Sequence, residues 1–522
     1  MILSHDLGTT GDKATLVDRD GRVVAAVNVG YPAVFGAGGQ AEQDPNDWWT
    51  AVSEATMRLL AETAVAPSDI DVVSFSGQMM GVVAVDGTGE PVRPAIIWAD
   101  TRSGPQCAAI ARTVSMERCY EITGHRLNPT YSLSKTAWLR DDEPGAFART
   151  RKVLQAKDWV AFRLTGTMVT DPSDASGTNA FDQHTGTWSE ELIGAAGLSV
   201  DLFPEIVPST TVVGKVTPAA ALETGLLAGT PVVIGGGDGP TAALGAGIVS
   251  AADGAYAYLG SSSWVSVSAD TPLHDPLMRS MTFNHVVPGR YVPTATMQAG
   301  GASLQWVTNV LSPDRHDRYA TLLAGAARAR AAEDGLYFLP HLLGERSPYW
   351  NPAARAAFVG LHMDHGPANM TRAVLEGVAF NLHTGLRAFT ENGVPVDAVS
   401  AIGGAANASL LLDVFANVWG VPVVARSLVD EANALGAAVV GGVGIGVFDD
   451  FDIARDLSEL RGRHEPDPTR TAELAESYDT FIDIYERLEP VFDATAQRHD
   501  DRRRERPAAG VQRTSLVTTV EG

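Results

Sequence analysis

The chain carries the same strand–turn–strand pattern near its start and again near its middle. In the first copy, Ile2 to Val17, alternating strands flank the turn Gly8-Thr9-Thr10-Gly11. In the second copy, Ala255 to Val267, similar strands flank Gly260-Ser261-Ser262. Four matching residues alone would be chance, but the shared strand context indicates an internal repeat. The pattern therefore predicts a duplicated α/β fold, with two similar domains facing each other across a cleft.

The turn of the first copy has the chemistry of a phosphate-binding loop. Gly8 and Gly11 are expected to supply the positive φ angles of a tight hairpin. Such a turn presents amide N–H groups and the hydroxyls of Thr9 and Thr10 in one concave patch, which suits phosphate. Asp6, at the end of the preceding strand, could hold Mg²⁺ directly or through water. The alternative is an ordinary hairpin in which Asp6 makes a turn hydrogen bond.

A second informative stretch spans residues 233–247, where a β-branched run is followed by three glycines and then Asp238. Gly239-Pro240 breaks the strand, and the residues after it are typical of a helix start. The glycines permit backbone angles and close approaches that a Cβ atom would forbid. A carboxylate on such a rigid turn can act as a catalytic base facing a ligand. The alternative is that Asp238 is the N-cap of the following helix.

Two further turns carry side chains that suit a polar ligand. Gln78, Met79 and Met80 lie in a turn between two expected strands and can line a pocket. Trp98, Asp100 and Arg102 occupy alternate positions at the end of another strand, which would place all three on one face. An aromatic ring, an acid and a base on one face form a good hydroxyl-binding set. The alternative is that the acid and the base form a surface ion pair of little energetic value.

Length and composition limit the classes of function. A chain of 522 residues is expected to form two or more domains. The formal net charge of -23 argues against a nucleic-acid partner, because that affinity comes from Lys and Arg on phosphates. No signal peptide and no uninterrupted apolar stretch of about 20 residues is apparent, so no membrane partner is predicted. The two cysteines, Cys107 and Cys119, cannot form a disulfide framework, which favours a reducing cytoplasm.

The second half holds one more candidate ligand site, and the end of the chain changes character. The turn Gly403-Gly404-Ala405-Ala406-Asn407 lets a flat ligand such as adenine lie against backbone. It is not a P-loop, and no dinucleotide-binding G-x-G-x-x-G follows a strand. The arginine-rich segment 498–522 predicts a solvated, disordered tail.

Together, a series of short stretches resembles the FGGY carbohydrate kinases, most closely the xylulokinases among them. The stretches follow the family's order over most of the chain: Asp6-Leu-Gly-Thr-Thr10 with Lys13, Gln78-Met-Met-Gly81, Trp98-Ala-Asp-Thr-Arg102, Gly235-Gly-Gly-Asp238, Gly301-Ala-Ser-Leu-Gln305, Phe338-Leu-Pro with Gly344-Glu-Arg-Ser-Pro348, Gly403-Gly-Ala-Ala-Asn407 and Glu431-Ala-Asn-Ala-Leu-Gly436. The resemblance implies two actin-like ATPase (ribonuclease H-like) domains around a central cleft. It also implies phosphorylation of a sugar or polyol by ATP with Mg²⁺, and it suggests a homodimer. The expected division is residues 1–244 for sugar binding and the base, 245–497 for ATP, and 498–522 for the tail.

The resemblance also assigns roles to individual residues. Asp238 resembles the base that takes the proton of the substrate hydroxyl, and Asp6, together with Asp238, resembles the Mg²⁺ site. The γ-phosphate hairpin corresponds to Thr9, Thr10 and Lys13. The sugar side corresponds to Gln78, Met79, Met80, Trp98, Asp100, Arg102, Tyr131, Asp238 and Gly239. The ATP side corresponds to Gly260, Ser261, Ser262, Gly301, Gln305, Gly403, Gly404, Ala405 and Asn407.

Two departures from the xylulokinase pattern bear on the substrate. Xylulokinases usually carry His where this chain has Met80, and Asn where it has Gly239. Losing both polar groups should change which hydroxyls are recognised, because an unpaired polar group in a site rejects the wrong substrate. The expected substrate is a pentulose such as D-xylulose. The alternatives are another ketose or small polyol of the ribulose, erythritol or threitol type, an actin-like ATPase without a sugar, and a degenerate sugar-binding regulator.

Overall fold

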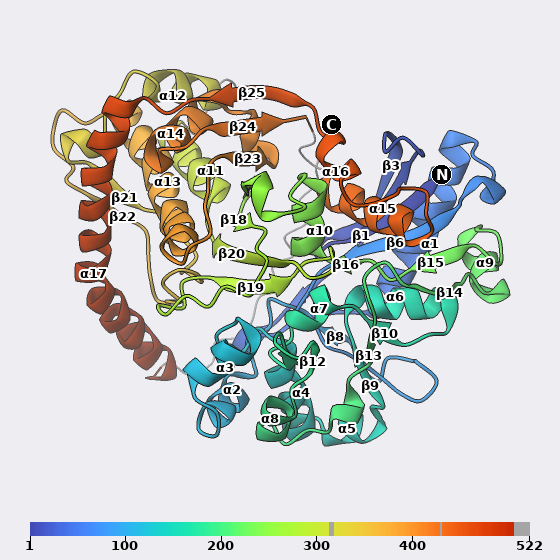
Figure 1. The fold of residues 1–522 in the computed structure, drawn as a ribbon. Coiled ribbons are helices and arrows are strands. Elements are labelled where there is room, and N and C mark those ends of the chain that lie inside the picture. Colours follow the sequence, from blue (N-terminus) through green and yellow to red (C-terminus); the bar gives the residue numbers. More distant parts are fainter. Residues whose placement is uncertain (313–317, 428–430, 506–522) are drawn as a thin grey trace.

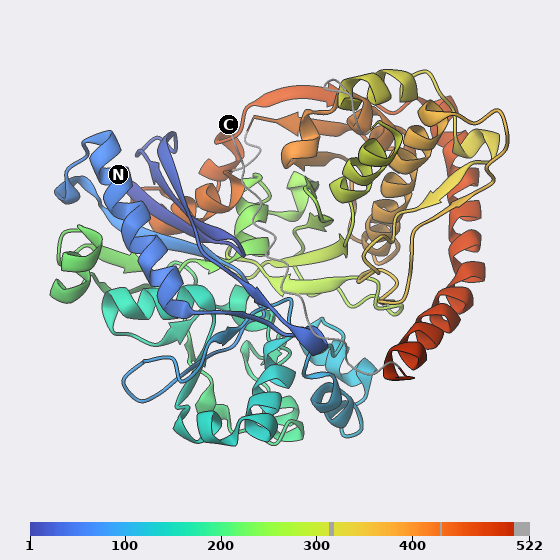
Figure 2. The same ribbon diagram turned by 180° about the vertical axis from the view of Figure 1, so that it is seen from behind.

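Each half of the chain is built around its own mixed β-sheet, and the two domains lie side by side (Figures 1 and 2). The computed structural model describes residues 1–312, 318–427 and 431–505. The first sheet has the order β14-β15-β6-β1-β2-β3, with β16 also paired to β6. Its strands are β1 (Ile2–Leu7), β2 (Gly11–Val17), β3 (Val23–Gly30), β6 (Val72–Gly77), β14 (Val212–Lys215), β15 (Pro231–Val233) and β16 (Gly236–Gly237).

The second sheet repeats the topology of the first. Its order is β19-β20-β18-β17-β23-β24-β25. Strand β17 is antiparallel to β18 and parallel to β23, as β1 is antiparallel to β2 and parallel to β6. The strands are β17 (Ala255–Leu259), β18 (Ser263–Val267), β19 (Met281–Asn284), β20 (Tyr291–Met297), β23 (Val399–Ile402), β24 (Val423–Arg426) and β25 (Leu460–His464). The predicted duplication is therefore confirmed.

Short strands outside these sheets pair locally, and helices fill the remaining layers. The short strands are β4 (Val34–Phe35), β5 (Ala41–Gln43), β7 (Val83–Val85), β8 (Ala95–Ile96), β9 (Lys152–Leu154), β10 (Val169–Thr170), β11 (Phe181–Asp182), β12 (Thr187–Trp188), β13 (Glu205–Ile206), β21 (Tyr337–Leu339) and β22 (Ala357–Val359). The helices of the first half are α1 (Pro45–Thr63), α2 (Gly104–Ala111), α3 (Met116–Thr123), α4 (Ser132–Asp142), α5 (Pro144–Arg149), α6 (Ala156–Thr165), α7 (Pro172–Ser176), α8 (Glu190–Ala195), α9 (Pro218–Thr224) and α10 (Asp238–Gly245). Those of the second half are α11 (Gly301–Leu311), α12 (Arg318–Ala326), α13 (Pro367–Glu391), α14 (Ser409–Trp419), α15 (Ala432–Gly444), α16 (Ile453–Asp456) and α17 (Pro468–Glu505).

The central strands of the first sheet, β1, β6 and β15, are buried on both faces, as their β-branched residues require. Residues on one face, including Leu3, Val73 and Val232, pack in the cluster that contains α1 and α6. Their neighbours on the opposite face, including Ile2 and Val72, pack against α15. Parallel strands covered by helices on both sides are expected to be apolar at every position.

Helix α15 comes from the second half of the sequence but packs on the first sheet, against β1, β6 and α10. Figure 1 shows it beside β1 and β6, away from the second sheet. The chain therefore returns to the first domain before its end. The division at residues 244 and 245 stays a prediction.

Helix α17 runs along the outside of the second domain and continues to Glu505 (Figure 1). It thus extends past residue 498, where the disordered tail was expected to begin. The rest of that tail, residues 506–522, lies outside the described residues. No helix in the described part of the chain is both long enough and apolar enough to cross a membrane.

A separate apolar cluster joins the two domains. It contains Met79, Met80 and Tyr131 from the first half, and Tyr256 and Met281 from the second. The residues predicted to line the sugar side therefore lie where the second sheet faces the first domain.

Candidate active site

The two predicted catalytic carboxylates lie at the carboxyl ends of strands in one sheet. Strands β1 and β16 both pair with β6 in parallel, so that Asp6 and Gly236 flank Ser76 in register. Asp238 follows β16 directly and is the first residue of α10. The glycine before β16 is required, because Gly235 has φ +72° and a Cβ there would come within 1.9 Å of the Phe75 carbonyl oxygen.

The alternative that Asp238 caps a helix is wrong. The N-cap position of α10 is Gly237, and no side chain caps this helix. The Oδ1 atom of Asp238 instead accepts a hydrogen bond from the backbone N–H of Gly239 at 2.8 Å. Burial, and then the nearby charge of Asp6, raise the pKa of Asp238 to about 7. A base with a pKa near neutrality is well matched to accepting a proton from a hydroxyl.

The first hairpin has the predicted position but a different backbone. Gly8 and Gly11 do not adopt positive φ, so that expectation is wrong. Gly11 is needed instead for close approach, because a Cβ there would lie 2.8 Å from the Val29 carbonyl oxygen. The hydroxyl of Thr9 accepts a hydrogen bond from Trp98 Nε1 at 2.9 Å, which connects the hairpin to the predicted sugar side. The neighbouring Thr10 is exposed.

The start of α15 contacts Asp6, one of the two predicted catalytic carboxylates. Asn433 donates a hydrogen bond from Nδ2 to Asp6 Oδ1 at 3.2 Å. Lys13 lies opposite Asp6 in the β1–β2 ladder, and its Nζ is 3.8 Å from Glu431 Oε1. The Glu431-Ala-Asn433 stretch was noted in the sequence without a role. Its contact with Asp6 depends on the return of the chain to the first domain, which no local pattern indicates.

Three of the predicted sugar-side residues, Met79, Met80 and Tyr131, pack in one apolar cluster near Asp238. Met79 packs on Gly237, where an added Cβ would be 2.6 Å from the methionine sulfur. Met80 has the unusual φ of +64°. Tyr131 is buried, and its hydroxyl contacts His125 Nδ1 at 3.0 Å.

Gln78, another predicted sugar-side residue, has a polar partner in the protein, and Arg346 lies at the sugar side although it was not predicted there. Gln78 is buried and donates from Nε2 to Gln43 Oε1 at 2.8 Å. Arg346, from the second half, places its guanidinium 3.9 Å from the sulfurs of Met80 and Met281. Sequence reasoning missed Arg346, because nothing local connects it to Met80.

Asp100 and Arg102 belong to an ion-pair network that is separate from the cluster of Met79, Met80 and Tyr131. The expectation that a strand places them on one face with Trp98 is wrong, because β8 ends at Ile96. The surface ion pair is also wrong, since Asp100 is only 1% exposed. Asp100 accepts hydrogen bonds from the Ala41 N–H at 2.8 Å and Arg102 Nε at 2.9 Å.

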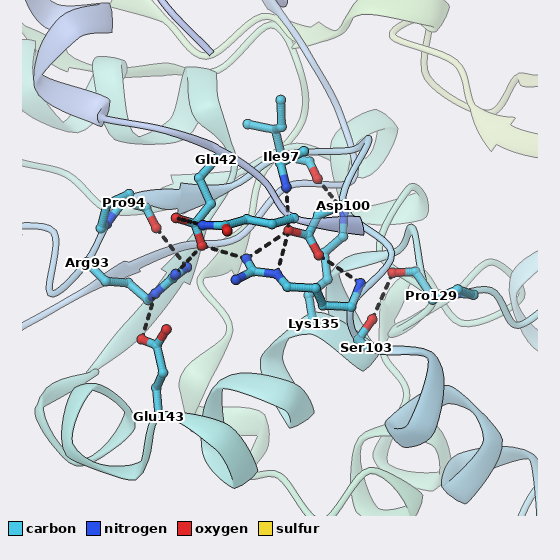
Figure 3. A network of polar contacts seen from close by, with 12 residues as sticks. Glu42, Arg93, Pro94, Ile97, Asp100, Ser103, Pro129, Lys135 and Glu143 are labelled. Carbon is cyan, nitrogen blue, oxygen red and sulfur yellow. Dashed lines mark hydrogen bonds and ion pairs between the residues drawn. The ribbon is translucent and has the colours of Figure 1, made fainter. Parts of the chain in front are cut away.

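The network extends further through charged neighbours (Figure 3). Glu42 accepts from Arg102 and from Arg93, and Arg93 also pairs with Glu143. The guanidinium of Arg102 lies 4.3 Å from the ring centroid of Trp138. These contacts hold together segments that are far apart in the sequence.

A cavity of about 690 Å³ lies in the second domain beside the second hairpin. Its wall includes most residues predicted for the ATP side, namely Gly260, Ser261, Gly301, Gln305, Gly404 and Ala405. Gly301 N–H donates to the Gly260 carbonyl at 2.8 Å, and a Cβ on Gly301 would lie 2.5 Å from that oxygen. The start of α11 can therefore contact the hairpin only with glycine at this position.

The cavity also has an apolar part that sequence reasoning missed. It is lined by Tyr319, Val374, Val378, Leu411 and Phe415, from α12, α13 and α14. Such residues are indistinguishable from core residues in sequence. Of the remaining predicted residues, Ser262, Gly403 and Asn407 lie beside the cavity rather than in its wall, and Asn407 Nδ2 donates to the Gly404 carbonyl at 3.3 Å.

Both halves of the chain match models of one protein family. The N-terminal domain model of the FGGY family of carbohydrate kinases matches residues 1–245, and the C-terminal domain model matches residues 255–445. The chain belongs to the FGGY family of carbohydrate kinases. As an FGGY kinase, it is a phosphotransferase that uses ATP to phosphorylate a hydroxyl of a sugar or polyol. The predicted family, fold class and type of enzyme are thus confirmed.

Relatives of this FGGY kinase include enzymes named for two kinds of substrate. It is 31% identical over 487 residues to the xylulose kinase of Bacillus subtilis, covering 93% of this chain and 96% of the relative. It is 32% identical over 498 residues to the gluconokinase of the same species, covering 93% and 94%. The crystal structure of a ligand-bound xylulose kinase from Lactobacillus acidophilus superposes with a TM-score of 0.89 at 27% identity, covering 95% of this chain and 99% of that one.

The acids of the FGGY kinase site suit a cation that is held mainly by phosphate. Among the described residues, no group of three or more His, Cys, Asp or Glu could hold a metal ion. Mg²⁺ usually binds through one or two carboxylates together with substrate phosphates and water. Burial raises the pKa of Asp6, and Asp6 in turn raises that of Asp238. A divalent cation beside this pair would relieve the repulsion, so the residues present fit Mg²⁺ bound with ATP.

Proposed function

We propose that this kinase phosphorylates a pentulose such as D-xylulose, with Asp238 as the base. The observation that carries the proposal is the position of Asp238, on a rigid strand-to-helix turn beside Asp6 and the first hairpin, with a pKa raised to about 7. Relatives named xylulose kinase cover nearly the whole chain. A hydroxyl is a weak nucleophile, and a carboxylate that accepts its proton makes attack on phosphorus easier.

The reaction requires positioning more than covalent chemistry. Asp238 takes the proton of the sugar hydroxyl onto its carboxylate. The hydroxyl oxygen then bonds to the γ-phosphorus of ATP, and the bond to the β-phosphate oxygen breaks to release ADP. The hydroxyls and amides of Thr9 and Thr10, with Lys13, hold the γ-phosphate. Asp6 and Asp238 would hold Mg²⁺, which would supply charge neutralisation on the phosphates.

The nucleotide is proposed to bind in the cavity of the second domain. Its adenine lies against the backbone of Gly404 and Ala405 and the apolar wall from α13 and α14. The phosphates then extend along Gly260, Ser261 and the start of α11 toward the first domain. Several glycines in this path leave room for the ligand to approach the backbone.

An aldonate such as gluconate is the second candidate substrate. The gluconokinase of Bacillus subtilis is as similar to this chain as the xylulose kinase is. Arg346 also lies at the sugar side, and its buried Nε has no hydrogen-bond partner among the described residues. A guanidinium with unused donors is a good receptor for a carboxylate.

A coupled assay of ADP release with MgATP tests both candidates. The panel includes D-xylulose, D-ribulose, gluconate, glycerol, erythritol and threitol. We expect one strong substrate, with D-xylulose giving the highest kcat/KM. A preference for gluconate would replace the pentulose by the second candidate. If the protein binds ATP but releases no ADP with any compound of the panel, a degenerate sugar-binding regulator is supported. Full ATP hydrolysis without any sugar would support an ATPase.

We also propose that the enzyme works in the cytoplasm as a homodimer. The support is its membership of a family of metabolic kinases and its two cysteines, which are both free. Light scattering of the purified full chain tests the dimer, and cell fractionation tests the location.

A further inference from the structure

A buried lysine lies behind the proposed sugar side. Lys135, on α4, is only 1% exposed, and its ammonium donates hydrogen bonds to three backbone carbonyls. The acceptors are Met80 at 2.9 Å, Ile97 at 2.8 Å and Thr130 at 2.6 Å. An ammonium has three N–H donors, so every donor is used. Figure 3 shows Lys135 and Ile97 next to the Asp100 network.

The three carbonyls belong to three separate segments, and each segment carries a residue proposed to face the sugar. Met80 is itself such a residue, and its backbone has a strained φ of +64°. Ile97 directly precedes Trp98, and Thr130 directly precedes Tyr131. A backbone conformation of this kind persists only when its surroundings hold it in place. The ammonium therefore fixes three neighbouring parts of one wall relative to each other.

The charge of Lys135 is not neutralised by an acidic neighbour among the described residues. No carboxylate in the described part of the chain forms an ion pair with it, whereas the other fully buried lysine, Lys157, pairs with Asp158, Asp171 and Asp174. Burial lowers the pKa of Lys135 well below its ordinary value, whereas Asp100 and the three carbonyl oxygens favour the ammonium, because a neutral amine would turn its lone pair toward one of these oxygens. Burying an ammonium without a counter-ion is costly. An apolar residue would fill this space at lower cost unless the three hydrogen bonds were needed.

We propose that Lys135 is a positioning residue for substrate recognition, which holds Met80, Trp98 and Tyr131 in the arrangement that binds the sugar. The proposal rests on the function proposed above for these three residues. Because all three donors of its ammonium are bonded to backbone carbonyls, Lys135 acts through the backbone and does not touch the substrate. Its loss should therefore affect the sugar and leave the nucleotide site, in the other domain, unchanged.

The variants are Lys135→Met, which keeps the length and removes every donor, and Lys135→Gln, which keeps two donors. Lys152→Met is the matched control. Lys152 also donates to two backbone carbonyls, those of Asp201 and Phe203, but neither segment carries a proposed site residue. Hydrogen–deuterium exchange of the full chain without ligand measures the order of residues 78–82, 95–99 and 128–132. Steady-state kinetics measure KM for D-xylulose and for MgATP separately.

We expect faster exchange in all three segments of Lys135→Met, and no change there in Lys152→Met. We expect KM for D-xylulose to rise about 10-fold or more, since misplacing a substrate by about 1 Å can cost a factor of about 100 in rate. KM for MgATP should stay the same, and Lys135→Gln should lie between Lys135→Met and the wild type. An unchanged KM for D-xylulose, or an equal rise in both KM values, would overturn the proposal.

Two other outcomes are also decisive. If neither Lys135 variant folds while Lys152→Met does, the lysine serves the whole domain and the positioning role is wrong. If the wild type does not phosphorylate D-xylulose, the proposed function fails, but exchange still tests the inference. Unchanged exchange in the three segments of Lys135→Met would then refute it.

Discussion

Replacing the proposed base by its neutral isostere should stabilise the protein while it stops turnover. Burial and Asp6 raise the pKa of Asp238 from 3.8 to about 7, which corresponds to about 4 kcal/mol at 1.4 kcal/mol per pKa unit. Because the side chain is partly exposed, solvent screening should reduce this, and we expect about 2 kcal/mol. A carboxyl group whose folded-state pKa is raised destabilises the fold once it ionises. The penalty therefore grows as the pH rises from about 4 to about 7 and is complete above that.

Thermal unfolding of Asp238→Asn and the wild type, both without ligands, measures this effect. At pH 8 the variant should melt about 5 °C higher, as expected for about 2 kcal/mol in a domain of this size. At pH 3 the difference should nearly vanish, because the carboxyl group is then protonated in both the folded and the unfolded chain. Asp364→Asn is the control, since that carboxylate is 97% exposed and should give no difference at either pH. A variant that is equally or less stable than the wild type at pH 8 would refute the argument that burial and Asp6 strain this carboxylate.

Three further predictions concern the same site. The logarithm of kcat/KM for the sugar should fall by about one per pH unit below about pH 7, because Asp238 must be ionised to accept a proton; a flat profile from pH 5 to 8 would contradict this role. Asn433→Ala removes a hydrogen bond to Asp6 and should raise KM for MgATP about 10-fold with little effect on KM for the sugar, which initial rates at varied MgATP measure. The double variant Met80→His, Gly239→Asn should raise kcat/KM for D-xylulose relative to D-ribulose, because a Cβ on Gly239 would meet no atom within 4 Å and an added polar group can reach the substrate.

The duplicated fold could be predicted because it depends on local patterns. Alternating strands around a hydroxyl-rich turn recur in both halves, and each pair forms the same antiparallel hairpin, β1–β2 in the first sheet and β17–β18 in the second. The turn at Asp238 was equally readable, since three glycines before a single acid permit a tight turn that side chains would forbid. In the first hairpin, however, the expectation that Gly8 and Gly11 adopt positive φ was wrong. Gly11 is required by the neighbouring backbone rather than by its own φ angle, whereas a Cβ atom on Gly8 would make only an ordinary contact of 3.4 Å with the Gly11 carbonyl oxygen.

The sugar side could be predicted only in part. The alternation of Trp98, Asp100 and Arg102 has meaning only within a strand, and β8 ends before it reaches them. Their actual partners, such as Glu42, come from a distant segment whose pairing no local pattern reveals. Lys135 could not be singled out in the sequence, because its three partners are backbone carbonyls, which every residue of the chain carries.

The same limit explains why the catalytic site cannot be divided between the two halves of the sequence. The ladder β1–β6–β16 brings Asp6 and Asp238 together, yet Asp6 accepts a hydrogen bond from Asn433, close to the start of α15. That helix also covers the face of the first sheet that carries Ile2 and Val72. A chain that ended at residue 245 would expose this apolar face and lack the side chain that orients Asp6. The proposed site for phosphoryl transfer therefore forms only when α15 has packed on the first sheet, so the stability of the first domain depends on residues of the second half of the chain.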